Sequence, residues 1–257
     1  MSQKIGTYTY KVEPFDADFR GQLSCEVLGK RILSAASFHA GERGFEKLEV
    51  NGVPYLWVLS RLVIQMDRWP KIGETYSVAT WIRSYFRYFT DRCFDILDEK
   101  GNKYGQVLSI WAMINSQNRQ PADITTLFGD MFDQYFDLER PFNVERSGHF
   151  HITGTKAVDV RKAYYSDLDT NGHVNSIRYI EFLLDAFPKS LYETADVERI
   201  EMEYSSESYA GDTLDVFLDE IGENRYVAEI RKRNGLLTEN GTVAACKCAV
   251  TFKAGNK

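Results

Sequence analysis

Apolar residues recur at helical spacing in two segments of the chain, residues 24–40 and 174–187. The first segment is followed by Gly41, and glycine is a residue at which helices commonly end. The second is apolar around most of its circumference, which is typical of a helix enclosed by a sheet, and Pro188 follows it. The pattern therefore predicts two helices, one in each half of the chain.

Most of the remaining chain has the composition of strands, in two sets of four. These runs are rich in β-branched and aromatic residues, and turn-forming residues separate them. The predicted strands are residues 57–68, 75–84, 88–97 and 104–115 after the first helix, and 199–208, 213–219, 226–233 and 242–253 after the second. A helix followed by antiparallel strands predicts an α+β layer architecture in which a sheet covers the helix.

The two sets of strands look like one unit that is present twice. Gly73-Glu74-Thr75 in the first set recurs as Gly211-Asp212-Thr213 in the second, and other turns and strands align with the same offset. A repeat this long indicates duplicated domains rather than a solenoid, although chance agreement of turn signals is the alternative. We expect an N-terminal repeat at residues 1–119, a linker at residues 120–150 and a C-terminal repeat at residues 151–257.

Composition and charge narrow the class of protein. The 257 residues are 44% hydrophobic and 26% charged, as in a typical globular chain, and four cysteines at these spacings indicate reduced thiols. A formal net charge of −6 argues against general nucleic-acid binding, which needs a basic face. The N-terminus lacks the apolar core of a signal peptide, and no apolar run approaches the roughly 20 residues of a membrane helix. We therefore expect a soluble, cytoplasmic protein without a membrane span.

The segment before the second helix contains polar residues that could carry chemistry. Asp169, Asn171 and His173 alternate, a spacing that can point three side chains the same way in an extended segment. The adjacent helix N-terminus offers unpaired backbone N–H groups to an oxyanion. Turn formation and helix capping would explain the Asp, Asn and Gly of this segment equally well, but they would not explain the histidine.

Three motifs of the chain resemble those of plant and bacterial acyl-acyl-carrier-protein thioesterases. Residues 168–180, LDTNGHVNSIRYI, are similar to the family signature LDxNxHVNNxxYI, from which only Ser176 departs. In the first half, residues 57–81 resemble the block WVxxR…DRYPxxGD…TW, with Trp69 and Glu74 as conservative departures. Residues 109–115, SIWAMIN, are similar to the strand SxWVMMN. The resemblance covers nearly the whole chain, from about Tyr8 to Lys253.

The resemblance implies a double hotdog fold, in which two repeats of a helix wrapped by an antiparallel sheet are fused in one chain. It implies hydrolysis of the thioester of acyl-acyl-carrier protein, which releases free fatty acid and ends chain elongation, without a cofactor or a metal ion. The catalytic residues that it implies are Asp169, Asn171, His173 and Glu207, the last of them on the strand that follows the helix.

Ser208 occupies the position at which plant members, in the strand EYRREC, have a cysteine once proposed as the nucleophile. A cysteine nucleophile is therefore excluded at this position, whereas a serine nucleophile stays open, although no GxSxG motif frames it. In the first repeat, residues 15–22 lead toward the helix without an Asn–His pair. We expect one active site per chain, in the C-terminal repeat, with the N-terminal repeat shaping the acyl pocket.

The resemblance also implies a partner, acyl carrier protein bearing an acyl chain. Arg83, Arg87 and Arg92 lie among aromatic residues on successive predicted strands, and they form a candidate docking patch for that acidic protein. Ordinary solvated strand charge is the alternative explanation. His39 lies at a helix end, where a cation suits the helix dipole. The sequence leaves the oligomeric state open, a homodimer included.

Three other functions compete with this interpretation. A thioesterase for coenzyme A esters would have a nucleotide-binding surface and would need no protein-docking patch. A non-catalytic acyl-binding module is disfavoured because Asp169, Asn171, His173 and Glu207 occur together. A hotdog dehydratase would have a histidine and an acid placed to remove water from a hydroxyacyl chain, and its signatures are not visible in the sequence.

Overall fold

A computed structural model describes residues 4–46, 48–129, 133–233 and 241–255 of the chain. Contacts within the chain divide it into two compact units, Met1–Arg146 and Ser147–Lys257. Each unit builds an antiparallel sheet around one principal helix, so the α+β class predicted from the sequence is confirmed. Among the described residues, no helix is both long and apolar enough to cross a bilayer.

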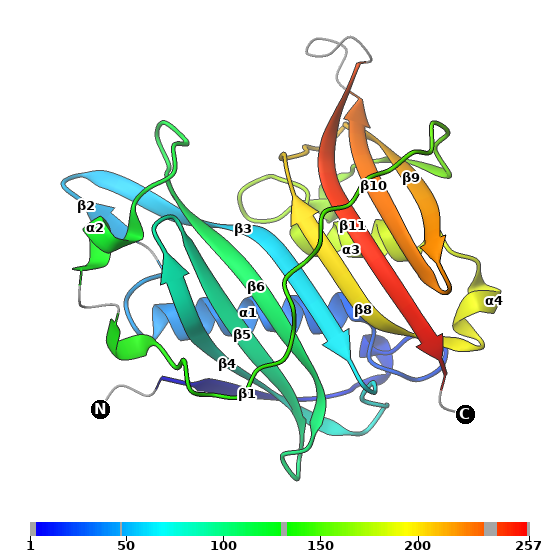
Figure 1. The fold of residues 1–257 in the computed structure, drawn as a ribbon, viewed down its shortest axis with the longest axis horizontal. Helices are drawn as coiled ribbons and strands as arrows, with labels where there is room; N and C mark the ends of the chain where they lie inside the picture. Colours follow the sequence, from blue (N-terminus) through cyan, green and yellow to red (C-terminus); the bar gives the residue numbers. More distant parts are fainter. Residues whose placement is uncertain (1–3, 47, 130–132, 234–240, 256–257) are drawn as a thin grey trace. The chain divides into compact units, whose positions relative to one another are not determined.

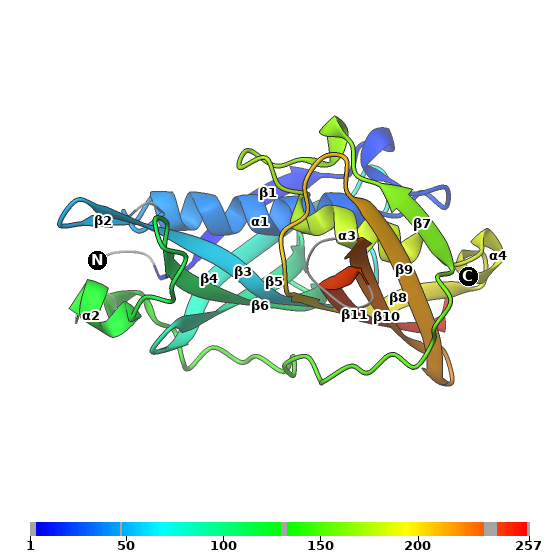
Figure 2. The same ribbon diagram turned by 90° about the horizontal axis from the view of Figure 1, so that it is seen from above.

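The first unit wraps its sheet around α1, Cys25–Gly41 (Figures 1 and 2). The Ser24 side chain caps this helix by accepting a hydrogen bond from the Val27 N–H at 3.2 Å. The strands are β1 Gly6–Lys11, β2 Leu48–Val50, β3 Val53–Met66, β4 Thr75–Phe86, β5 Phe89–Asp98 and β6 Lys103–Asn115. They lie in the order β1-β4-β5-β6-β3, all antiparallel, with β2 paired to β3. Leu28 and Ile32 of α1 are fully buried.

The second unit repeats this plan around α3, Ser176–Leu184 (Figures 1 and 2). The other elements are β7 Asp159–Lys162, a short helix α4 Lys189–Tyr192, β8 Ala195–Tyr204, β9 Thr213–Gly222, β10 Arg225–Arg233 and β11 Thr242–Ala254. The strand order is β8-β11-β10-β9-β7, again antiparallel. Ile177, Ile180 and Leu183 of α3 are fully buried, and the Tyr204 hydroxyl donates to the Ser176 carbonyl at 3.0 Å. These contacts fasten the start of α3 to β8.

The second helix is shorter than the sequence pattern predicts. It begins at Ser176 rather than at residue 174, because Asn175 is its N-cap and the Asn175 Oδ1 accepts the Ile177 N–H at 2.9 Å. It ends at Leu184 rather than at residue 187. The motif residues therefore lie in a loop ahead of the helix and are not part of it.

The strand after α3 and α4 also ends early, and this changes the position of Glu207. β8 ends at Tyr204, and the N–H groups of Ser205 and Ser206 both donate to the Ala245 carbonyl, which interrupts the regular ladder. The prediction that Glu207 lies on a strand is therefore wrong. Glu207 lies in the turn between β8 and β9, outside the regular ladder of the sheet.

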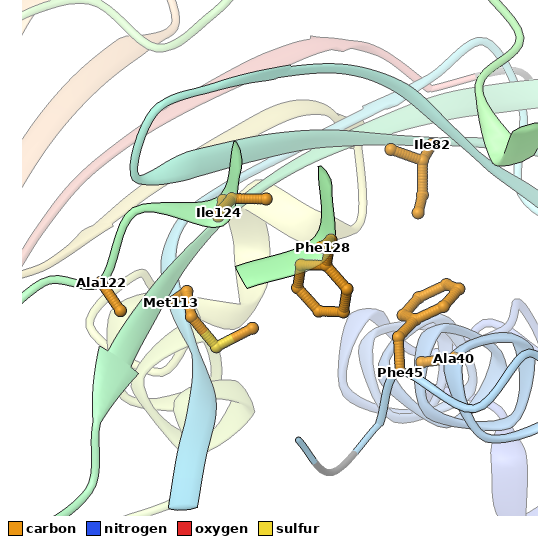
Figure 3. Close-up of a cluster of buried hydrophobic side chains, with 7 residues drawn as sticks. All are labelled: Ala40, Phe45, Ile82, Met113, Ala122, Ile124 and Phe128. Atoms are coloured by element: carbon orange, nitrogen blue, oxygen red, sulfur yellow. The ribbon is translucent and has the colours of Figure 1, made fainter. Parts of the chain in front are cut away.

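The segment predicted to be a linker contains a short helix, α2 Ile124–Phe128, which packs on the first unit. Ile124 and Phe128 are buried with Phe45 and Met113 in one apolar cluster (Figure 3). The Phe128 ring also stacks on Trp57 at a centroid distance of 6.2 Å. Five helical residues are too few to leave a periodic signal in the sequence. The proposed boundaries at residues 119 and 150 stay a prediction.

A polar cluster is buried inside the first unit. His39 of α1 is fully buried and Arg92 of β5 is 5% exposed. Arg92 Nη1 donates to His39 Nδ1 at 3.0 Å and to Thr80 Oγ1 at 3.3 Å, and His39 Nε2 donates to the Lys4 carbonyl at 3.0 Å. Burial, reinforced by the Arg92 charge, lowers the pKa of His39 to about 3, so the imidazole is neutral at physiological pH. Burial also lowers the pKa of Arg92 to about 9.

Two predictions from the sequence are wrong at this cluster. Arg92 does not belong to a surface patch with Arg83 and Arg87, because its side chain is buried in the unit's interior. His39 does not act as a cation at the end of α1, because burial keeps its ring neutral. Neighbouring strand residues alternate between the two faces of a sheet, and the sequence alone did not identify which face of β5 is covered.

The neutral His39 should make the stability of the first unit depend on pH. In the unfolded chain a histidine binds a proton below about pH 6.5, whereas the folded protein keeps His39 neutral down to about pH 3. The unfolded state then binds more protons, so stability is highest above pH 6.5 and falls on acidification, by at most about 1.4 kcal/mol per pH unit. Urea unfolding between pH 7.5 and 4.5 should reveal this slope, and His39→Gln should flatten it. Equal slopes for the two proteins would contradict the assignment.

Candidate active site

A braced loop precedes α3 and carries three of the four residues that the sequence singled out. Leu168 pairs with Val174 across this loop, and the Asp169 N–H donates to the His173 carbonyl at 2.7 Å. The Asp169 Oδ1 accepts the backbone N–H groups of Asn171 at 2.8 Å and of His173 at 3.1 Å. One carboxylate oxygen therefore shapes the loop from within.

A backbone hydrogen bond joins this loop to the turn that carries Glu207. The Val174 N–H donates to the Ser208 carbonyl at 2.8 Å. As a result the His173 Nδ1 lies 3.5 Å from the Glu207 Oε1, at the outer limit of a hydrogen bond. The two side chains are 24% and 35% exposed, so a substrate or a water molecule can reach them.

The structure thus brings Asp169, His173 and Glu207 together, and it places Asn171 in the same loop. Asn171 is exposed, and its side chain forms no hydrogen bond with the part of the chain that the structure describes. Its amide can therefore turn toward a bound molecule without first breaking a contact. Such an amide offers both a donor and an acceptor.

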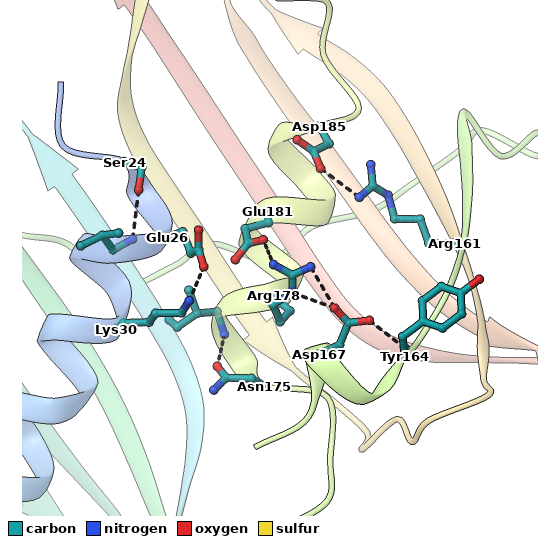
Figure 4. A network of polar contacts seen from close by, with 12 residues as sticks. Ser24, Glu26, Lys30, Arg161, Tyr164, Asp167, Asn175, Arg178, Glu181 and Asp185 are labelled. Carbon is teal, nitrogen blue, oxygen red and sulfur yellow. Dashed lines mark hydrogen bonds and ion pairs between the residues drawn. The ribbon is translucent and has the colours of Figure 1, made fainter. Parts of the chain in front are cut away.

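The start of α3 is held by a second aspartate that the sequence analysis missed. Asp167 is 4% exposed; its Oδ1 accepts from Arg178 Nε at 2.9 Å and its Oδ2 accepts the Tyr164 N–H at 2.8 Å (Figure 4). The Asn175 cap occupies the Ile177 N–H, so this amide is not available to an oxyanion. A buried carboxylate paired with an arginine in the first turn of the helix leaves no sequence signal distinct from surface charge.

Tyr209 and Lys232 also contact Glu207, and neither was singled out from the sequence. The Tyr209 hydroxyl donates to the Glu207 Oε2 at 3.1 Å, and the Tyr209 ring meets the His173 ring edge-to-face at 5.1 Å and 90°. Lys232 Nζ donates to the Glu207 carbonyl and lies 5.8 Å from the centre of the Tyr209 ring. Tyr209 lies two residues after Glu207 in the same turn, whereas Lys232 comes from β10, so only the tertiary structure brings the two together.

Ser208 is poorly placed to be a nucleophile. Its side chain is fully buried, and its hydroxyl forms no well-aligned hydrogen bond with a described residue. The neighbouring hydroxyl is that of Tyr179, whose pKa is raised by burial. A serine nucleophile needs a base within hydrogen-bond reach of its hydroxyl, and no histidine or carboxylate of the described chain bonds to Ser208. In the same part of the chain, no group of three His, Cys, Asp or Glu residues could hold a metal ion.

Comparison with known proteins identifies the family. Residues 4–132 match the model of the acyl-ACP thioesterase N-terminal domain, and residues 153–253 match that of the C-terminal domain. The chain belongs to the acyl-ACP thioesterase family. The resemblance stated from its motifs is thereby confirmed.

Solved and curated members of the family resemble the chain over much of its length. The crystal structure of an acyl-ACP thioesterase from Bacteroides thetaiotaomicron is 43% identical, covers 97% of this chain and 98% of its own, and superposes with a TM-score of 0.86. The chloroplastic oleoyl-acyl carrier protein thioesterase 2 of Arabidopsis thaliana is 22% identical over 91% of this chain and 69% of its own length. A chloroplastic palmitoyl-acyl carrier protein thioesterase of that plant is 27% identical over 59% of this chain, but only 38% of its own length. The chain has the double hotdog fold of the family.

The first unit contains a copy of the same loop with different side chains. The Asp18 Oδ1 accepts the N–H groups of Arg20 at 2.8 Å and of Gln22 at 3.1 Å, as Asp169 does for Asn171 and His173. The Leu23 N–H donates to the Pro70 carbonyl at 2.7 Å, as Val174 does to Ser208. Gln22 therefore stands at the position of His173, and Trp69 at that of Glu207. Duplication preserved the backbone scaffold, while only the second unit holds the imidazole and the carboxylate.

The two aspartates should have the same structural role. Asp169→Ala removes the acceptor of two backbone N–H groups and should lower the free energy of unfolding by about 1–3 kcal/mol. Asp169→Asn keeps an acceptor oxygen and should cost less. Urea unfolding of these variants and of the matched Asp18→Ala and Asp18→Asn pair would measure the effect. If Asp169→Ala unfolds at the same urea concentration as the unchanged protein, the carboxylate does not hold the loop.

Proposed function

We propose that this protein hydrolyses the thioester of acyl-acyl-carrier protein and releases the free fatty acid, which ends chain elongation. The observation that carries the proposal is the meeting of His173 and Glu207 at 3.5 Å in the second unit. The first unit has the same backbone with Gln22 and Trp69 instead, so the fold does not require the pair. Membership of the acyl-ACP thioesterase family supports the substrate class.

We propose Asp169, Asn171, His173 and Glu207 as the catalytic set, with water as the nucleophile. Glu207 takes a proton from a water molecule as its oxygen attacks the thioester carbonyl carbon, a role worth roughly 10²–10⁴ in rate. The tetrahedral intermediate then collapses, the C–S bond breaks, and the thiolate takes up the proton that Glu207 holds. The products are a fatty acid and the free thiol of the carrier, so no cofactor or metal ion enters the balance.

The other residues orient the reacting atoms. His173 and Asn171 hold the water molecule and the thioester carbonyl, and Asp169 keeps their loop in shape through its two accepted N–H groups. The N–H groups of Val174, Asn175, Ile177 and Arg178 are bonded within the chain. We therefore assign the charge of the oxyanion to the Ser176 N–H at the start of α3, a contact worth about 10²–10³ in rate. Because the first unit lacks the imidazole and the carboxylate, we assign it the binding of the acyl chain.

Single substitutions separate the water mechanism from a covalent one. Glu207→Gln and His173→Ala should each lower kcat on acyl-acyl-carrier protein by about 10²–10⁴, because they remove polar groups that touch the reactants. Ser208→Ala should keep most of the activity, and so should Gln22→Ala, the matched change in the first unit. The measurement is single-turnover hydrolysis of a panel of acyl-carrier-protein and acyl-coenzyme A thioesters.

Each outcome of this experiment decides a specific point. If Ser208→Ala is as inactive as His173→Ala, the water mechanism is wrong and a covalent intermediate must exist. If the unchanged protein cleaves only coenzyme A thioesters, the proposed substrate is wrong while the hydrolysis stands. If it cleaves neither class, the chain is an acyl-binding module.

We further propose that Arg83 and Arg87 form a docking patch for the acidic carrier protein. Arg87 is 62% exposed and lies 3.6 Å from the Asp123 carboxylate. Arg83 is partly exposed, donates to the Phe142 carbonyl at 3.4 Å and lies over the Phe142 ring. A chain with a net charge of −6 repels an acidic partner at long range unless a local basic surface steers the encounter.

Charge reversal tests the docking patch. Arg83→Glu with Arg87→Glu should raise KM for acyl-acyl-carrier protein, and leave hydrolysis of a small acyl thioester nearly unchanged. The defect should shrink as salt is added, because the screening length falls to about 8 Å near physiological ionic strength. Lys156→Glu with Lys189→Glu, at two exposed lysines of the second unit, is the matched control, because two charge reversals change the net charge by the same amount. An equal loss with both substrates would contradict the docking role, and so would an equal KM increase in the control.

A further inference from the structure

We propose that Tyr209 is a positioning residue for this reaction, which orients the general base and the imidazole relative to each other. The inference rests on the proposed thioester hydrolysis and on the roles assigned there to Glu207 and His173. Tyr209 belongs to none of the sequence motifs that carry the family resemblance. It contacts both of the residues on which the chemistry depends.

The two oxygens of the Glu207 carboxylate have different partners. Oε2 accepts the Tyr209 hydroxyl at 3.1 Å, while Oε1 faces the His173 Nδ1 at 3.5 Å. A carboxylate held at one oxygen cannot rotate freely, so the other oxygen stays directed at the imidazole and at a water molecule beside it. A hydrogen bond from a neutral hydroxyl fixes this orientation without neutralising the base.

The same tyrosine also restrains the imidazole. The Tyr209 and His173 rings meet edge-to-face, with centroids 5.1 Å apart and planes at 90°, which is a preferred geometry for aromatic pairs. One side chain therefore sets the orientation of both groups, the carboxylate through its hydroxyl and the imidazole through its ring. Supporting contacts of this kind hold catalytic groups close to their productive geometry.

Tyr209 is itself held in place by charged neighbours. Its N–H donates to the Asp212 Oδ2 at 2.9 Å, and Lys232 Nζ lies 5.8 Å from the centre of its ring while donating to the Glu207 carbonyl. The charged and titratable groups near Glu207 include His173 from the loop, Tyr209 from the turn, Lys232 from β10 and the buried Tyr179 phenol from α3. Asp212 of the turn accepts the Tyr209 N–H. Of these groups, Tyr209 donates a side-chain hydrogen bond to the carboxylate at 3.1 Å.

The fold does not need a tyrosine at this position. In the first unit the equivalent turn carries Lys71, whose N–H donates to the Glu74 Oε2 at 2.8 Å, as the Tyr209 N–H does to Asp212. The Glu74 N–H donates to the Lys71 carbonyl at 2.9 Å, and the Asp212 N–H donates to the Tyr209 carbonyl at 3.1 Å. The same turn therefore forms with a lysine in the unit that has no base to orient. This argues that the tyrosine side chain serves the site rather than the turn.

Two substitutions separate the two contacts of Tyr209. Tyr209→Phe removes the hydroxyl and keeps the ring, whereas Tyr209→Leu removes both, and neither changes the backbone of the turn. Tyr165→Phe is the matched control, because this tyrosine is 90% exposed in the same unit. Turnover of acyl-acyl-carrier protein and of a small acyl thioester would be measured from pH 5 to pH 9 with the full chain, together with urea unfolding.

Tyr209→Phe should lower kcat by about 10-fold on both substrates with little change in KM, the size expected for loss of one hydrogen bond to a charged group. Since a donated hydrogen bond favours the charged form of a carboxylate, the acidic limb of the kcat/KM profile should move to higher pH. Tyr209→Leu should lose more activity than Tyr209→Phe. The unfolding midpoints should match that of the unchanged protein, and Tyr165→Phe should leave activity and pH profile unchanged.

A measurement without substrate keeps this inference separate from the proposed function. The ring proton resonances of His173 in NMR spectra, assigned with His173→Ala, should keep their shifts in Tyr209→Phe and move in Tyr209→Leu, because an edge-to-face ring shifts nearby protons. If an active protein keeps its kcat and pH profile in Tyr209→Phe, Tyr209 does not position the base. If the His173 resonances are the same in Tyr209→Leu, it does not position the imidazole. If the unchanged protein hydrolyses neither substrate, the proposed function fails while the NMR result still decides the ring contact.

Discussion

One carboxylate oxygen shapes the loop on which the proposed chemistry depends. The Asp169 Oδ1 gathers the N–H groups of Asn171 and His173, which folds the loop back on itself. The loop can then present the Val174 N–H to the Ser208 carbonyl, and this bond places the next turn against it. The approach of Glu207 to His173 is the consequence. Without these hydrogen bonds, nothing local would hold His173 and Glu207 together, because they lie more than 30 positions apart in the sequence.

Comparison of the two units distinguishes the residues that hold the loop in shape from the residues that serve the chemistry. Asp18 repeats the bracing of Asp169 in the first unit, although that unit has no histidine in its loop. The Asp18 carboxylate also binds the Arg20 guanidinium through two hydrogen bonds at 3.0 Å, a stabilising pair at the position where the second unit has the exposed Asn171. In the first unit the polar side chains of the loop thus bind each other, while in the second unit the Asn171 side chain stays available to a substrate. Such a difference is expected where function, rather than stability, selects the side chain.

Burial decides the role of several charged residues that look alike in sequence. Arg83, Arg87 and Arg92 come from one hairpin, yet the third is enclosed with His39 and Thr80 while Arg87 is largely exposed. A guanidinium that is removed from water can serve packing or a buried hydrogen-bond network, but it cannot steer a partner in solution. Burial likewise makes His39, which the sequence predicted to be a cation at a helix end, a neutral ring inside the unit.

The fold class, the duplication, the principal helices and most strands could be predicted from the sequence, because these depend on periodic apolar positions and on local turn residues. The sequence also identified the loop with Asp169 and His173, since those residues lie within a few positions of one another. It did not reveal the early end of β8, the short α2 or the burial of Arg92, because a ladder interruption and the covered face of a strand depend on distant chain segments. The contacts of Tyr209 and Lys232 with Glu207 could be identified only from the tertiary structure. Contacts between side chains from a turn and from β10 arise only when the sheet brings them together, and no local pattern encodes them.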